Sequence, residues 1–439
     1  MYDRRWTPLS ISCRRTIPRG SVGVVTDVRN AHRAVVTGIG VVAPGGIGVT
    51  EYWSSLLSGR SAVGPVTLFN AGKLRIRTAA EVRNFDPHRH LPPDVKWRRL
   101  ARHTCFTLAA LEEALADARL DAAFLTPSRH VFVVAGVGTS ALELMELAAD
   151  RLRDGHHDRM EPWIVTSSQP NAVTVAMAAR LGTKVSSTTI STDCVSGLDA
   201  VCAAAEAVRS GRVEMAVAAG ADAPITPSTF ASFGVLPLLS ERNDDPAHAS
   251  RPFDRDRDGG VLGEGAGVVV LESLAHARAR GARPWIEICG GASCPDPAGS
   301  PAGTGLALSM EMALANACRA PADMDYICAH GPSHPVIDRT ETAAIRRLFG
   351  RRADAVPVSS IKGVIGNPLA AAGPLQVIAC ALAMRHGLVP PTANYTTPDP
   401  ACDLDYVPQA RRLDVRRALT NVHGVGGGNS TLVVARPEP

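Results

Sequence analysis

The chain has 439 residues, 45% hydrophobic and 20% charged, which is ordinary for a globular protein with a large core. Its 46 basic and 42 acidic residues nearly cancel, so its charge gives no reason to expect nucleic acid as a partner. The ten cysteines form no CxxC pair and no zinc pattern, and no apolar run approaches the roughly 18 residues of a membrane span. We therefore expect a cytoplasmic protein without a metal centre and without a membrane association.

Residues 1–32 offer little to bury, and we expect them to form a disordered extension. The N-terminal half, residues 33–280, begins after them. Short apolar runs, several of them leading into glycine, predict strands over 34–42, 131–135, 214–220 and 265–271, and a further strand is expected over 187–191. Apolar residues at helical spacing predict helices over 50–57, 101–119, 172–181 and 197–208.

The C-terminal half, residues 281–439, has a similar order of elements without a repeated sequence. Strands are predicted over 285–289, 326–329, 356–359, 417–421 and 430–434. Helices are predicted over 305–318, 340–349 and 370–385. Residues 291–303, rich in turn formers, are expected to form an exposed excursion between the halves. Nearly continuous apolar strands that alternate with helices indicate an α/β fold with sheets covered on both faces.

Cys194 lies at a sharp turn between a predicted strand and a predicted helix. The N-terminus of a helix stabilises a thiolate and would lower the pKa of the thiol. Its free N–H groups can also hold the oxyanion that forms when a thioester is attacked. Most cysteines are simply buried, as we expect for Cys202 in the middle of the next helix, and the local context alone leaves both interpretations of Cys194 open.

Longer motifs resemble a known family. Residues 251–260, followed by 263–267, match a signature of the β-ketoacyl synthase (ketosynthase) family of the thiolase superfamily almost residue for residue, and 36–40 and 230–240 also fit. The similarity covers roughly residues 33–437 and is strongest to the ketosynthase subunits of type II polyketide systems. The resemblance implies a thiolase-like five-layer αβαβα sandwich of two similar halves, a dimer, and an acyl group carried on Cys194.

The resemblance also implies that His330 activates the carbonyl of the second substrate, because a neutral imidazole can donate a hydrogen bond at physiological pH. A surface loop histidine is the weaker interpretation, since the flanking residues keep the family's register. Lys362 and Glu341 match the family's lysine and its acidic partner. As a buried pair they would organise the site rather than take part in the chemistry.

Asn367 stands where the family has its second catalytic histidine. An asparagine amide can donate a hydrogen bond to an enolate oxygen, but it cannot act as an acid or a base. Type III ketoacyl synthases resemble this arrangement, so a catalytic set of Cys194, His330 and Asn367 is chemically consistent with decarboxylative condensation.

The expected substrate pocket departs from the family at several positions. Pro332 and His334 replace two threonines that contact the pantetheine arm in relatives, and His423 stands where an aromatic residue is usual. Val425 replaces a phenylalanine that gates the cysteine and helps to bury the departing carboxylate. Phe233 is expected to line the same pocket. The lost ring at Val425 predicts a larger acyl pocket.

Three functions remain open. The favoured one is a ketosynthase of polyketide or other secondary-metabolite biosynthesis, which loads an acyl group from acyl carrier protein onto Cys194 and then condenses it with a malonyl-type thioester. The second is transfer of that acyl group to an alcohol or amine without decarboxylation. The third is a non-catalytic partner subunit like the chain-length factors, which typically lack the cysteine. All imply a homodimer or a heterodimer with a second ketosynthase-like subunit, and no cofactor beyond the carrier's phosphopantetheine.

Overall fold

The computed structural model describes residues 32–120, 130–182, 184–300 and 303–438. The expected extension, residues 1–32, lies outside the described residues except for His32. The predicted strands and helices of both halves are present, with ends that differ from the predictions by a few residues.

The N-terminal half contributes five strands to the main path of one continuous sheet, in which β2 (Gly46–Ile47) also pairs with the end of the first. They are β1 (Ala34–Ala43), β5 (His130–Gly136), β6 (Lys184–Ile190), β7 (Met215–Asp222) and β8 (Gly265–Ser273). Their order across the sheet is β6-β5-β7-β8-β1. β5 runs parallel to β6 and β7, whereas β8 is antiparallel to β7 and β1. Every residue of β1, β7 and β8 is buried, which is the reason for their continuous apolar sequences.

The C-terminal half repeats this topology. Its strands are β9 (Ile286–Pro295), β10 (Tyr326–Cys328), β11 (Val358–Ser359), β14 (Arg417–His423) and β15 (Gly428–Ala435). They lie in the order β11-β10-β14-β15-β9, so the third, second, fourth, fifth and first strands follow one another as in the N-terminal half. The first strands of the two halves, β1 and β9, pair antiparallel and join the halves.

The expectation of an exposed excursion over 291–303 is wrong for its first part. Residues 291–295 belong to β9 and pair with β15, because β15 supplies the backbone partners that a loop would lack. Residues 296–300 form a loop beyond the strand, and 301–302 lie outside the described residues.

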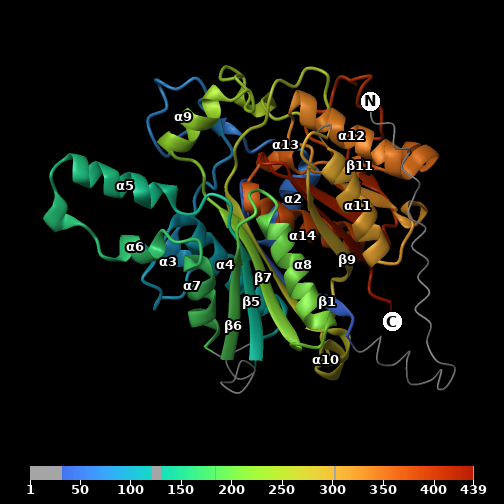
Figure 1. Ribbon diagram of the computed structural model, residues 1–439, viewed down its shortest axis with the longest axis horizontal. Helices are drawn as coiled ribbons and strands as arrows, with labels where there is room; N and C mark the ends of the chain where they lie inside the picture. Colours follow the sequence, from blue (N-terminus) through green and yellow to red (C-terminus); the bar gives the residue numbers. More distant parts are fainter. Residues whose placement is uncertain (1–31, 121–129, 183, 301–302, 439) are drawn as a thin grey trace.

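The helices form three layers around the sheet (Figure 1). α4 (Arg102–Asp117) and α7 (Ala172–Leu181) cover the outer face of the N-terminal half. α11 (Thr304–Asn316) and α12 (Pro335–Phe349) cover the outer face of the C-terminal half. α8 (Ser196–Arg209) and α14 (Ala372–His386) pack against each other and against strands of both halves. This is the five-layer αβαβα arrangement that the sequence predicts.

The remaining elements are short or peripheral. The helices among them are α2 (Val49–Ser58), α3 (Pro87–His90), α5 (Leu142–Arg153), α6 (Trp163–Ser167), α9 (Pro227–Val235), α10 (Leu274–Ala279) and α13 (Lys362–Ile365). The strands are β2 (Gly46–Ile47), β3 (Gly64–Pro65), β4 (Thr78–Ala79), β12 (Leu388–Val389) and β13 (Arg411–Arg412). α5 and α6 project from the body of the molecule (Figure 1).

One helix among the described residues, Leu369–His386, is long and apolar enough to cross a membrane. Of its 18-residue window, 89% is buried inside the protein. The apolar composition of this segment is therefore explained by its place in the middle layer, as the core helix α14 and the turn that precedes it.

Candidate active site

A small cavity of about 40 Å³ lies against the start of α8 and brings the predicted catalytic and pocket residues together. Its lining includes Cys194, His330, Asn367, Phe233, Pro332, His334, His423 and Val425. Apolar side chains that the sequence did not single out complete the wall: Leu238, Leu239, Val261, Leu262, Ile337 and Leu369. Lys362 and Glu341 do not line the cavity and lie behind His330.

Cys194 follows β6 and precedes the first residue of α8, Ser196, so the strand–turn–helix elbow is present as predicted. The thiol is only 1% exposed. Burial, followed by the charge of Asp193, raises the pKa of Cys194 well above its usual value. The expectation that the helix N-terminus would lower the pKa of this thiol is therefore wrong, because desolvation and a neighbouring carboxylate outweigh the helix. The resting thiol is protonated.

A backbone donor from the other half of the chain reaches the nucleophile. The Val425 N–H forms a hydrogen bond toward the Cys194 sulfur and acts to lower the pKa of the thiol, against the effect of burial. Val425 lies in the turn between β14 and β15, and its side chain is 49% exposed. Its backbone thus faces the sulfur while its side chain lies at the edge of the cavity.

His330 follows β10 and is held through its backbone. Its N–H donates to Glu341 (2.8 Å) and its carbonyl accepts from the Lys362 ammonium (2.6 Å). Burial, followed by the nearby Lys362 and His423, lowers the pKa of the His330 imidazole well below its usual value. The ring is consequently neutral at physiological pH, as the sequence argument required. Its Nδ1 is buried and has no hydrogen-bond partner among the described residues.

Lys362 and Glu341 support His330 in a way that differs from the expected ion pair. Among the described residues no salt bridge joins the two side chains, and each instead bonds to the backbone around His330. The Lys362 ammonium also donates to Gln376 (3.1 Å). Burial lowers the pKa of Lys362 to about 8, and burial raises the pKa of Glu341. Both groups therefore fix the position of the imidazole and remain outside the reaction cavity.

The backbone of Asn367 is held by two hydrogen bonds. Its N–H donates to the Val261 carbonyl (2.7 Å), and its own carbonyl accepts from the Gly263 N–H (2.9 Å). The side-chain Oδ1 is buried and lacks a partner among the described residues. A buried amide oxygen without a hydrogen-bond donor costs free energy unless a ligand donates to it. The cavity therefore offers an unused hydrogen-bond acceptor here.

His334 lines the cavity but its ring is occupied. Its Nδ1 accepts from the N–H groups of Val336 (3.2 Å) and Ile337 (3.3 Å) at the start of α12, and its Nε2 lies 3.0 Å from the Pro237 carbonyl. Nε2 must therefore carry the proton, because a carbonyl only accepts. The neighbouring Ser333 stands at φ 72° with a buried hydroxyl that accepts from the Arg251 N–H. None of these groups is free to replace the lost threonine hydroxyls.

His423 and Phe233 complete the predicted pocket. The His423 ring lies 6.0 Å from the His330 ring, centroid to centroid, and its Nδ1–H donates to the Asn429 Oδ1 (2.7 Å). Phe233, on α9, packs partly buried against the core and lines the same cavity. The larger acyl pocket expected at Val425 stays a prediction, and the cavity of about 40 Å³ as it stands has no room for a long acyl chain.

Two residues that matter here were missed by the sequence analysis. Asp193 lies 3.5 Å from the Cys194 sulfur, through its Oδ1. Gln376, a lone polar side chain in the apolar helix α14, donates through Nε2 to Cys328, Ala329, Thr420 and Asn421 and accepts from Lys362. The signal for Gln376 was its place as a single polar residue in an otherwise apolar predicted helix. The position directly before the nucleophile was the signal for Asp193.

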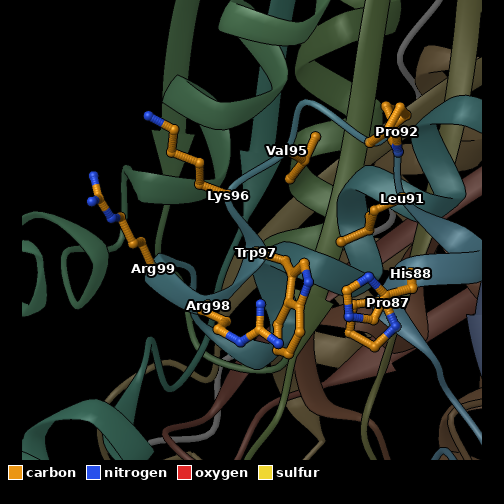
Figure 2. A pocket seen from close by; sticks show the side chains of 10 residues that line it. Pro87, His88, Leu91, Pro92, Val95, Lys96, Trp97, Arg98 and Arg99 are labelled. Carbon is orange, nitrogen blue, oxygen red and sulfur yellow. The ribbon is translucent and has the colours of Figure 1, made fainter.

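A larger hollow of about 420 Å³ lies elsewhere on the surface, along residues 87–99 (Figure 2). Its wall includes His88, Trp97 and the basic side chains Lys96, Arg98 and Arg99. None of the predicted catalytic or pocket residues lines it. Size alone therefore does not identify the reaction site, and the chemistry of the lining does.

Comparison with known proteins identifies the family. The family model of the β-ketoacyl synthase N-terminal domain matches residues 31–277, and that of the C-terminal domain matches residues 291–396. A putative polyketide β-ketoacyl synthase 1 from Streptomyces halstedii is 43% identical over 419 residues, which is 93% of this chain and 99% of that protein.

Two solved structures extend the comparison. The ishigamide ketosynthase/chain length factor superimposes with a TM-score of 0.87 at 33% identity, over 92% of this chain and 99% of the other. A ketosynthase bound to the hexaketide, in complex with its type II polyketide acyl-carrier protein, has a TM-score of 0.84 at 33% identity, over 92% and 99% of the two chains. The matched regions include both halves and the cysteine elbow, and the chain belongs to the β-ketoacyl synthase family.

Proposed function

We propose that this protein is a ketosynthase-type acyltransferase of polyketide or other secondary-metabolite biosynthesis that carries an acyl group on Cys194. The observation that supports this most strongly is the shared cavity of a buried thiol, a neutral imidazole and an unpartnered amide, from Cys194, His330 and Asn367. The similarity to a putative polyketide β-ketoacyl synthase supports the same class of reaction.

In the first step, the Cys194 sulfur attacks the carbonyl of an acyl thioester on a carrier protein. Because the thiol is protonated, its proton must move to a base as the carbon–sulfur bond forms, and the neutral His330 ring is the base in the cavity. The carrier's thiolate then leaves and takes this proton. The Cys194 and Val425 N–H groups are the proposed donors to the oxyanion.

In the second step, a malonyl-type thioester loses carbon dioxide to give an enolate. His330 and the Asn367 amide stabilise the enolate oxygen through hydrogen bonds. The enolate carbon attacks the Cys194 thioester, a carbon–carbon bond forms as the carbon–sulfur bond breaks, and the leaving Cys194 thiolate takes a proton that comes from solvent through His330. Asn367 cannot transfer a proton, so proton movement in both steps depends on His330.

A second candidate is transfer of the acyl group to an alcohol or an amine. Two observations favour it: the buried Asn367 Oδ1 and His330 Nδ1 lack partners, and Val425 has no ring to bury a carboxylate. An alcohol or amine would donate its O–H or N–H to such acceptors, whereas a malonyl carboxylate has no proton to donate. His330 would then remove the proton as the oxygen or nitrogen attacks the thioester, the carbon–sulfur bond would break, and the leaving Cys194 thiolate would take this proton.

Neither route requires a metal or a bound organic cofactor, since the chain supplies the nucleophile, the base and the hydrogen-bond donors. We propose that the substrates arrive on the phosphopantetheine of an acyl carrier protein, and that the protein acts as a homodimer or as a heterodimer with a second ketosynthase-like subunit. The ketosynthase solved with its acyl-carrier protein and the ketosynthase/chain length factor structure support these partners. Free cysteines throughout the described residues favour a cytoplasmic location.

The test is the intact mass of the protein after incubation with a panel of acyl carrier-protein thioesters and, separately, with a malonyl thioester. We expect a mass gain that Cys194→Ala abolishes and that Cys202→Ala, a change in the helix that follows Cys194 and outside the cavity, leaves intact. Carbon dioxide release from malonyl selects condensation. Transfer to an added alcohol or amine without that release selects the second candidate. No acylation by any donor would overturn the proposal in favour of a non-catalytic partner subunit.

A further inference from the structure

Asp193 connects the nucleophile to a turn more than 200 positions away in the sequence. Its Oδ1 accepts from the Cys194 thiol at 3.5 Å, and its Oδ2 accepts from the Gly426 N–H at 3.1 Å. Residues 424–428, which we name the gate turn, are closed by hydrogen bonds from the Gly424 N–H to the Gly428 carbonyl (2.8 Å) and from the Gly427 N–H to the Gly424 carbonyl (2.9 Å). One carboxylate therefore holds the thiol and the gate turn together.

The local backbone of Asp193 and the glycine at the start of the gate turn both favour this contact. Asp193 stands at φ 61°, in the left-handed region that a non-glycine residue occupies only at an energetic cost. A Cβ on Gly424 would lie 2.7 Å from the Asp193 Oδ2, so only glycine leaves space for the carboxylate at that position. The strained backbone on one side and the missing side chain on the other are consistent with a specific contact.

The gate turn must move for the proposed reaction to occur. It carries Val425, which lines the cavity, and the cavity of about 40 Å³ has room for only about three water molecules. An acyl chain on Cys194 therefore has to displace part of the wall. Among the lining residues, Val425 can move most easily. Its side chain is half exposed, whereas the strands on either side of it, β14 and β15, are buried.

We propose that Asp193 is a positioning residue that couples acylation of Cys194 to release of the gate turn, an inference that rests on the proposed function. Acylation exchanges the thiol proton for the acyl group: the thiol and the acyl thioester give the acylated cysteine and the carrier's free thiol, which takes the proton. The sulfur of the acylated cysteine has no proton to donate. Asp193 then loses its bond to the nucleophile, so one link between the elbow and the gate turn is lost, whereas the Gly426 contact and the bond from the Val425 N–H remain.

The same carboxylate should also restrain the reactivity of the free thiol. Its negative charge and its hydrogen bond both favour the protonated form, and both raise the pKa of Cys194. Removal of the charge therefore increases the fraction of thiolate at neutral pH. This gives a readout that a purely structural role for Asp193 would not produce.

The first experiment is hydrogen–deuterium exchange of the Gly426 amide in the full chain. We compare the untreated protein with protein alkylated by iodoacetamide, which replaces the thiol proton as acylation does. We expect severalfold faster exchange after alkylation, and fast exchange with and without alkylation in Asp193→Ala. Cys194→Ser, which keeps an O–H donor, should resemble the untreated protein, and Cys194→Ala should resemble the alkylated one. Equal exchange in the serine and alanine variants would overturn the proposal.

The second experiment is the rate of iodoacetamide alkylation of Cys194 against pH. Asp193→Asn keeps the size of the side chain and removes its charge, and a fall of one unit in the pKa of Cys194 gives about tenfold faster alkylation at neutral pH. The control is Asp199→Asn, because Asp199 lies in the same elbow but accepts from Thr192 (2.6 Å). An unchanged rate in Asp193→Asn contradicts the proposal. Neither experiment needs an acyl donor, so failure of the proposed acyl transfer would be seen separately.

Discussion

Burial determines the protonation of the residues around Cys194. The thiol has a raised pKa and the His330 imidazole a lowered one, so the resting pair is neutral rather than a thiolate and an imidazolium. The positive charge nearest to the imidazole in this arrangement is Lys362, one of the causes of the lowered pKa of His330. The proposed chemistry therefore depends on a proton transfer that accompanies the attack, to a base whose strength is set mainly by burial and in part by Lys362.

This role of Lys362 can be tested by Lys362→Met. Loss of the ammonium removes an effect that lowers the pKa of His330, so that pKa should rise. Since only the unprotonated ring can accept the thiol proton, the acidic limb of the acylation rate should move to higher pH by the same amount. The measurement is the rate of Cys194 acylation between pH 5 and pH 8. Lys362→Arg, which keeps the charge, is the control, and an identical acidic limb in the methionine variant would contradict this account.

His103 on α4 is a second buried histidine with an effect on stability. Its side chain is fully buried, and neither ring nitrogen has a partner among the described residues. Burial lowers its pKa from 6.5 to about 4. Between these values the unfolded chain binds a proton that the folded chain excludes, so stability falls as the pH falls.

The expected loss from this histidine is about 2 kcal/mol between pH 7.5 and pH 5. We predict that His103→Leu removes this part of the pH dependence of the free energy of unfolding, measured with urea at both pH values. His156→Leu, at an exposed histidine, is the control. Equal pH dependence in wild type and His103→Leu would show that the buried ring is not the source.

The candidate catalytic residues could be named from the sequence, and their supporting contacts could not. Cys194, His330 and Asn367 were placed by the register of long motifs, and all three meet in one cavity. The contact between Asp193 and Gly426 joins positions 233 residues apart, and no local pattern encodes it. The pKa of the thiol was misjudged for a similar reason: the helix is visible in the sequence, whereas the burial that outweighs it depends on the whole fold.

At the scale of elements, the position of Cys194 depends on the close packing of α8 and α14. A Cβ on Gly373 would lie 2.3 Å from the Leu198 nitrogen, and a Cβ on Gly197 would lie 1.9 Å from the Ala370 carbonyl oxygen. Both contacts are to backbone, which cannot move aside without a shift of a helix. The glycines therefore let α14 hold the first turn of α8, directly after the nucleophile.

We predict that Gly373→Ala destabilises the protein by about 1–3 kcal/mol, as overpacking of a core does. It should also change the rate of Cys194 alkylation, because the first turn of α8 has to move. The measurements are urea unfolding and alkylation by iodoacetamide. The control is Gly234→Ala on α9, where the new Cβ would meet Ile76 at 3.8 Å and alanine is the better helix former. Equal stabilities of the two variants would contradict the packing argument.

The sequence predicted the elements whose apolar residues occupy buried positions. α14 and the strands β1, β7 and β8 are almost wholly buried, and their apolar runs were unambiguous. α5 was not predicted, although its apolar residues follow helical spacing, and Met145 and Leu152 on it are exposed. α9 did carry a local signal, Thr226 as an N-cap followed by a proline, which the search for apolar periodicity did not use.

At the scale of the whole molecule, the active site is assembled from both halves. Cys194 comes from the N-terminal half, whereas His330, Asn367 and Val425 come from the C-terminal half. The two halves share one strand order, and their equivalent helices α8 and α14 meet in the middle layer. Neither half contains a nucleophile and a base together, so the proposed chemistry requires the complete fold.

The sheet ends in a strand that suggests how two such molecules associate. β6 is the last strand on its side and pairs only with β5, so its other edge offers unpaired backbone groups. Ser187 and Thr188 on β6 are exposed although they lie in a strand of the main sheet. The opposite end of the sheet is β11, which is only two residues long. We therefore expect the proposed dimer, whether with an identical or a similar chain, to form along β6.

Thr188→Lys tests this expectation, since a lysine on an edge strand opposes strand-to-strand pairing. Wild type should sediment as a dimer at micromolar concentration in analytical ultracentrifugation, and Thr188→Lys should sediment as a monomer with an unchanged circular dichroism spectrum. Ala116→Lys, which adds the same charge at an exposed position of α4, should remain a dimer. If Thr188→Lys also remained a dimer, the association would have to use another surface. A monomeric wild type would instead point to the heterodimer, because the edge of β6 would then be open for a different chain.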